Sequence, residues 1–216
     1  MSNGKFLPIS HNNLPARKSM NIQTPIVNEK NDVSRLTLLS EDALANELLR
    51  DKPSRLLFAE IVRRYQKQIY YHVRNLLVSH DDADDATQNT LIKIWQHADQ
   101  FKGESKLRTW IYRIATNEAI NLLRKRKPSI DFNEAQPEMA DLITSDVYLS
   151  GDDIALKLQK AICYLPFKQK LVFSLRYFED LSYEEIADLT TTSESALRAS
   201  YHHAVKKLEI YLGVLG

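Results

Sequence analysis

The sequence predicts an all-α protein, with two small helical domains joined by a flexible acidic linker and a helix-turn-helix in the C-terminal domain. Apolar residues recur at three- and four-residue steps almost everywhere from Leu36 onward, which is the period of an amphipathic helix. No stretch shows the alternation that a strand requires. The pattern is interrupted at 128–153, a segment with seven Asp or Glu and no Lys or Arg. We therefore expect domains at 36–127 and 154–216.

Residues 1–35 are expected to form a disordered tail. Residues 1–33 contain six Asn and three Pro, with few large apolar side chains and no periodicity. Such a segment buries too little apolar surface to offset the entropy lost on ordering.

The N-terminal domain is expected to contain three main helices. The first follows Ser54, a suitable N-cap, and its stripe runs from Phe58 to Leu76. The second spans about 82–100, and aspartates in its first turn suit the positive helix N-terminus. The third begins near Ser105, after a loop that contains Gly103.

The C-terminal domain is expected to contain helices at 154–164, 167–178, 182–190 and 193–212. Ser182 and Glu185 have the spacing of a capping box at the start of a short helix. The polar run 190–193 favours a tight turn before a longer helix with a polar outer face. This order is typical of a helix-turn-helix, although an ordinary helical hairpin in a bundle would have the same pattern.

Charge is distributed in opposed blocks, although the formal net charge is only +1. The stretch 101–127 holds eight Lys or Arg against two Glu, with aromatic and Asn side chains among them. Cations can neutralise phosphates, whereas aromatic faces and amides can hold or read unstacked bases. This stretch is therefore predicted to contact opened DNA.

Several classes of protein are disfavoured. None of the five Gly lies in a phosphate-binding motif, and the six His lack metal-ligand spacing, so we expect no enzyme, cofactor or metal site. Cys163 lies among apolar residues and is expected to be a buried, inert thiol. No apolar run reaches the ~20 residues needed to span a bilayer, and no secretory segment is evident, so we expect a cytoplasmic protein without membrane insertion.

Two motifs resemble those of extracytoplasmic-function (ECF) sigma factors, the compact two-domain class of the sigma-70 family. DADDATQNTLIKIW at 82–95 is similar to the helix that grips the clamp of core RNA polymerase, and 101–127 to the promoter-melting segment. The segment 164–208 resembles the domain that reads the minus-thirty-five element. The resemblance covers roughly 36–127 and 154–212.

The resemblance implies three sets of site residues. A polymerase-docking set would comprise Asp84, Asp85, Gln88, Asn89, Leu91, Ile92 and Trp95. A minus-ten set would comprise Phe101, Lys102, Ser105 and Lys106 around a flipped base, Asn117 and Asn121 on bases, and Arg124, Lys125, Arg126 and Lys127 on phosphates. A helix-turn-helix set would comprise Ser193, Ser195, Ala196, Arg198, Ala199, His202 and Lys206, with Arg198 the best candidate for a base or phosphate contact.

Structural interpretations of these residues stay open. Trp110, Ile111 and Ile114 fit a core better than a contact, and Asn117 and Asn121 would also suit solvated positions. Cations at 124–127 and acids at 84–85 complement helix dipoles. Asn89 stands where an acidic residue is frequent in the family, and Ser200 where a recognition helix commonly has Arg.

The implied partners are core RNA polymerase, promoter DNA as duplex minus-thirty-five and melted minus-ten element, and an anti-sigma factor. The acidic linker is expected either to avoid DNA and thread a basic polymerase channel or to be a spacer. The alternative function is a dimeric helix-turn-helix transcriptional regulator that acts without being a polymerase subunit. This alternative explains the C-terminal domain but assigns no role to 82–127.

Overall fold

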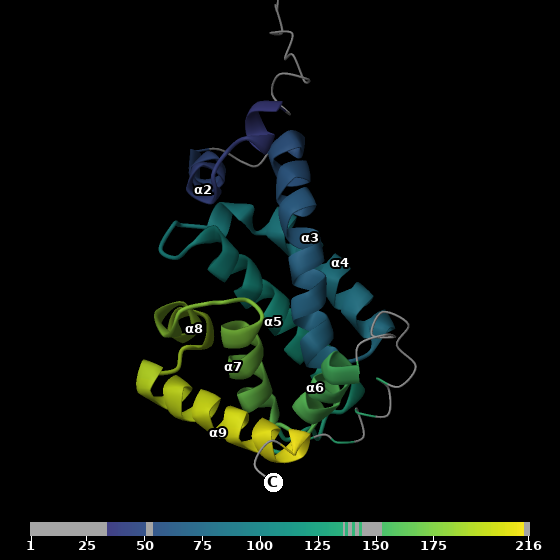
Figure 1. Ribbon diagram of the computed structural model, residues 1–216. Coiled ribbons are helices and arrows are strands. Elements are labelled where there is room, and N and C mark those ends of the chain that lie inside the picture. The colour runs from purple at the N-terminus through teal and green to yellow at the C-terminus, as the bar shows by residue number, and fades with distance from the viewer. Residues whose placement is uncertain are drawn as a thin grey trace, which may run out of the picture.

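Figure 1 shows a computed structural model that describes residues 34–50, 54–135, 137, 140, 143 and 153–213. Its helices are α2 (Glu41–Arg50), α3 (Arg55–Leu77), α4 (His80–Gln96), the 3₁₀ turn η1 (Ala98–Gln100), α5 (Leu107–Arg126), α6 (Asp153–Cys163), α7 (Phe167–Tyr177), α8 (Tyr183–Thr190) and α9 (Glu194–Leu212). Across these ranges no strand forms, and the all-α prediction is confirmed.

Serine side chains cap the starts of several helices. The hydroxyl of Ser54 accepts a hydrogen bond from the third amide of α3, as predicted. Ser182 and Glu185 form both hydrogen bonds of the predicted capping box. Ser79 caps α4, so this helix begins at His80, two residues earlier than expected. Its predicted end at 100 is also wrong, because the α-helix stops at Gln96 and tightens into η1.

The N-terminal core lies where α3, α4 and α5 meet. Ile69, Ile94 and Ile111 are fully buried there, as their helical spacing predicts. Trp95, at the end of α4, leaves 43% of its surface exposed. Its ring contacts Phe58 edge-on with centroids 5.0 Å apart, so it covers the rim of the core.

The two domains are in direct contact. Helix α7 packs on α3, and α8 packs on α5 (Figure 1). Leu175 and Ile186 are fully buried in the same apolar cluster as the residues of the first domain. Helix α9 crosses the end of the molecule farthest from α2. The domains are therefore joined by a continuous apolar core in addition to the linker.

The described part of the linker also packs on the helices. The rings of Phe132 and Phe167 lie 4.9 Å apart, and Ile143 is buried with Val78 and Cys163. Cys163 is buried as predicted, and burial raises the pKa of its thiol. Most of the acidic segment, and residues 1–33 of the expected tail, lie outside the described residues; 34–37 form a helical turn.

Candidate nucleic-acid and protein interfaces

The expected polymerase-docking residues form an exposed face on α4. Six of the seven are exposed, and Leu91 is half-buried beside them. Ile92 and Trp95 contribute the apolar part of this face, with 52% and 43% of their surfaces exposed. The two side chains are three residues apart and therefore lie on one face of the helix.

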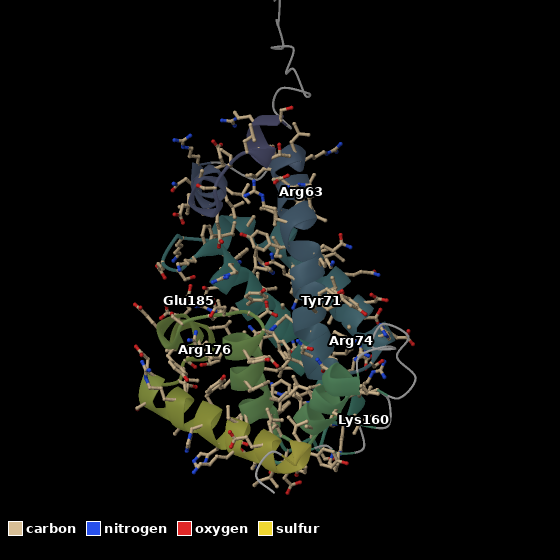
Figure 2. All side chains as sticks on the ribbon, viewed as in Figure 1. Arg63, Tyr71, Arg74, Lys160, Arg176 and Glu185 are labelled. Carbon is tan, nitrogen blue, oxygen red and sulfur yellow. The ribbon has the colours of Figure 1, made fainter. Side chains whose placement is uncertain are left out.

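A groove of about 780 Å³ runs beside this face, between α3 and α4, and the sequence reasoning missed it. Its α3 wall carries Arg63, Lys67, Tyr71 and Arg74, three of which are marked in Figure 2. These residues recur at three- and four-residue steps on the outer side of α3. The groove wall could have been predicted from this spacing, because residues three and four apart lie along one helix face.

The loop before α5 borders a pocket of about 460 Å³, where the sequence predicts capture of a flipped base. Phe101 and Trp110 both line this pocket. Phe101 is only 5% exposed, and its ring packs on that of Trp110 with centroids 5.5 Å apart. Lys102 and Ser105 are at the edge of the pocket. Arg113 also lines the pocket and was not singled out from sequence. The lining combines aromatic rings and cations, as a site for a stacked base would, with the acidic residues Glu104 and Asp188.

Asn117 and Asn121 are both exposed and lie one turn apart on α5. The amide of Asn121 donates to Glu118 over 3.4 Å. Glu118 is itself buried and paired with Lys93 of α4. This arrangement orients one member of the Asn pair and leaves the side chain of Asn117 directed to the surface.

The four cations at the end of α5 do not have equal surroundings. Arg124 lies over the ring of Phe132 at 5.5 Å, and Arg126 forms an ion pair with Asp82 at the start of α4. Burial raises the pKa of Asp82, although Arg126 opposes that effect. Lys125 has no ion pair among the described residues. The cluster therefore combines structural cations with at least one that faces solvent.

Helix α8 covers the first turns of α5 through charged contacts. Lys106 Nζ lies 3.0 Å and Arg108 3.8 Å from Glu185, on the side of α8 that faces α5 (Figure 2). The guanidinium of Arg113 donates to the carbonyl of Asp188 over 2.8 Å. Burial raises the pKa of Glu185, but hydrogen bonds from Ser182 and Lys106 outweigh it and the net shift is downward.

One neutral hydrogen-bond donor joins the same interface. Tyr112 is 2% exposed, and its hydroxyl donates to the carboxylate of Glu179, just after α7. Burial raises the pKa of both groups. The contact therefore ties the middle of α5 to the C-terminal domain from within the interface.

The helix-turn-helix set lies on the exposed side of α9. Ser193 caps the helix, and the other six members are exposed along it. Thr191 has φ 55°, the left-handed conformation that ends α8 and lets α9 begin three residues later. The guanidinium of Arg198 pairs with Glu194 at 3.0 Å and lies 4.4 Å from the ring centre of Tyr183.

The part of the chain that the structure describes holds no group of three or more His, Cys, Asp or Glu placed to bind a metal ion. Among its helices, none is both long and apolar enough to cross a membrane.

Two family models match separate parts of the chain. Residues 61–128, from α3 to the end of α5, match sigma-70 region 2. Residues 155–208, which include most of α6–α9, match sigma-70 region 4.

Named relatives match over both parts. The chain is 31% identical to ECF RNA polymerase sigma factor SigW of Bacillus subtilis, over 70% of this chain and 86% of the relative. It is 30% identical to the ECF RNA polymerase sigma-E factor of Haemophilus influenzae, over 70% and 85%.

Two solved structures share the fold. One is the sigma factor RpoE in complex with the anti-sigma factor NepR from Bartonella quintana, with a TM-score of 0.59, 23% identity and coverage of 73% of this chain and 97% of the other. The other is CnrH in complex with the cytosolic domain of CnrY, with a TM-score of 0.60, 21% identity and coverage of 81% and 97%.

Proposed function

Because the chain belongs to the sigma-70 family of RNA polymerase sigma factors, in its ECF class, we propose that α4 docks it on core polymerase while α5 and α9 engage promoter DNA. Members of this family are transcription initiation factors and not enzymes. The observation that carries the proposal is the order of the two matches in one chain. A region 2 match covers the docking face and the basic helix, and a region 4 match covers the helix-turn-helix.

Within α5, we assign different tasks to different residues. The pocket lined by Phe101, Trp110 and Arg113 would hold an unstacked base of the minus-ten element. Asn117 and Asn121 would contact neighbouring bases, since amide side chains can donate to and accept from base edges. The end of the helix would contact phosphates. Helix α9 would enter the major groove of the minus-thirty-five element through its exposed face.

An anti-sigma factor is the other proposed partner. Both of the solved structures described above are complexes with partner proteins, and one of those partners is an anti-sigma factor. The exposed Ile92 and Trp95 and the groove on α3 give this chain a surface that such a partner could cover. Because polymerase works on chromosomal DNA, we place the protein in the cytoplasm.

Transcription with purified components tests this function. We expect the chain to bind promoter DNA weakly alone, and to direct initiation from defined start sites when mixed with core RNA polymerase on genomic fragments. A dimeric helix-turn-helix regulator would instead give a footprint on its operator without polymerase. Such a footprint, together with no specific transcripts from the mixture, would favour the regulator.

Trp95→Ala is expected to weaken binding to core polymerase by about 30-fold, because large aromatic anchors at docking surfaces contribute about 2 kcal/mol or more. The ring is already 43% exposed, so the fold should tolerate the change. Fluorescence titration against core polymerase measures the affinity. Trp95→Phe retains an aromatic ring and is expected to bind within a few-fold of wild type. Equal affinity for all three proteins would remove Trp95 from the interface.

Lys125→Gln is expected to reduce the salt dependence of promoter binding by about one ion equivalent, since each phosphate contact contributes a slope of about one. The measurement is the affinity of the polymerase complex for a promoter at salt concentrations from about 50 to 200 mM. Affinities for DNA change enough over this range to define the slope. Lys157→Gln makes the same charge change on the exposed side of α6 and is the control. Identical slopes for both variants would exclude a phosphate contact by Lys125.

A further inference from the structure

Tyr183, the first residue of α8, lies under the guanidinium of Arg198, which belongs to the next helix. The ring centre and the guanidinium carbon are 4.4 Å apart, well within the range of a cation–π contact. Tyr183 was not singled out from sequence. Its place in the fold is informative, because it bridges the two helices of the helix-turn-helix.

The tyrosine ring is held in place from several sides. Tyr201 of α9 contacts it edge-on with centroids 6.4 Å apart, and Tyr201 in turn stacks on Phe173 of α7 at 5.9 Å. Arg176 lies 5.6 Å from the centre of the Tyr183 ring. A hydrogen bond of 2.9 Å to the carbonyl of Leu181 fixes Arg176. The ring is therefore connected through Tyr201 to Phe173 in the core of the domain.

The contact with the Tyr183 ring leaves N–H groups of Arg198 available to other acceptors. A guanidinium is planar, and when its flat face lies over a ring its N–H groups still point outward at the edge. One of these donors binds Glu194 over 3.0 Å. Glu194 is in the first turn of α9, where a carboxylate is stabilised by the helix dipole even without a cation. The ion pair is thus a replaceable one, and the side chain of Arg198 is 60% exposed.

We propose that Tyr183 is a positioning residue that holds Arg198 for recognition of a guanine in the major groove. Guanine presents two acceptors, O6 and N7, that match two donors on one guanidinium edge. On binding, those acceptors would replace Glu194 while the tyrosine contact persists. Pre-positioning matters because a free arginine side chain loses rotamer entropy when it is fixed. The inference rests on the proposed function, in which α9 reads duplex DNA.

The test uses the full chain assembled with core RNA polymerase and a DNA library with a randomised segment, followed by sequencing of the bound molecules. Wild type is expected to enrich guanine at one position, and Arg198→Ala to lose that preference without affecting other positions. Tyr183→Leu should reduce the preference at the same position about tenfold. Tyr183→Phe keeps the ring face and should restore it.

Two further comparisons separate positioning from a structural effect. Lys at position 198 presents a point charge that cannot form the planar pair, so in an Arg198→Lys background the change Tyr183→Leu should have little additional effect. Loss of selectivity at every position in Tyr183→Leu would overturn the proposal, as would an unchanged guanine preference. If the wild-type assembly enriched no sequence at all, the proposed function itself would fail.

Discussion

Lowering the pH from 7 to 5 is expected to reduce the free energy of unfolding by about 2 kcal/mol through His72 alone. This residue of α3 is fully buried, and its Nε2 lies 2.9 Å from the hydroxyl of Thr116 on α5. Burial lowers the pKa of His72 from 6.5 to about 3. The unfolded chain therefore takes up a proton as the pH falls through 6.5, whereas the folded chain does not until about 3. The stabilising contribution of the neutral ring is fully present above pH 6.5 and is lost progressively as the pH falls from 6.5 to about 3.

Urea unfolding at pH 7 and pH 5 measures this contribution when wild type is compared with His72→Leu. The variant lacks the titrating ring, so the difference in stability between the two proteins should shrink by about 2 kcal/mol at the lower pH. Thr116→Val is the matched control, because it removes the hydroxyl and keeps the ring. The loss of unfolding free energy caused by Thr116→Val should be similar at pH 7 and pH 5. A pH dependence that is the same in wild type and His72→Leu would show that the ring is protonated in the folded state.

Tyr112→Phe is expected to increase the population in which the two domains are separated, by about tenfold. The substitution keeps the ring on His72, where the centroids are 4.9 Å apart, but removes the hydroxyl that donates to Glu179. Because burial already raises the pKa of Glu179, its carboxylate is poorly solvated at this interface. Leaving a partly buried acceptor without its donor costs about 1–3 kcal/mol, and domain separation relieves that cost by returning Glu179 to water.

Energy transfer between dyes attached at Asn46→Cys on α2 and His203→Cys on α9 measures the separation. Both positions are exposed and lie at opposite ends of the molecule (Figure 1). Tyr71→Phe, which removes an exposed hydroxyl on α3, is the control and should leave the transfer efficiency unchanged. If Tyr112→Phe lowers the melting temperature of the whole protein without changing the distance, the hydroxyl stabilises the α5 fold and not the contact between domains.

The starts of α3 and α8 and the buried helix faces could be predicted because they depend on neighbours in sequence. The caps at Ser54 and Ser182 act on amides three residues away, so their chemistry is legible locally. The periodic positions Ile69 and Ile111 are buried for the same reason. An apolar stripe does not by itself reveal which of its edges stays exposed, as the Trp95 edge of α4 does.

The pairing of distant charges could not be predicted. Glu185 has a complete local explanation in its capping box, so nothing in the sequence indicates that its second oxygen contacts Lys106. Arg126 likewise reads as a helix-end cation, although it is paired with Asp82 of another helix. Arg113 lines the pocket before α5 only because α5 turns its side chain toward that loop and α8. These contacts depend on how helices pack, which leaves no periodic signature.

The contact between α8 and α5 has a consequence for the response to salt. Glu185 and the carbonyl of Asp188 bind cations at the start of α5, so α8 supplies oxygen ligands to side chains that would otherwise be open to phosphate oxygens. DNA that reached these cations would displace a ligand that the protein already supplies, instead of condensed ions from solution alone. For these residues, salt weakens both the contact with α8 and the contact with DNA, and the two effects oppose each other. The slope of log affinity against log salt concentration should therefore be smaller than their number of charges.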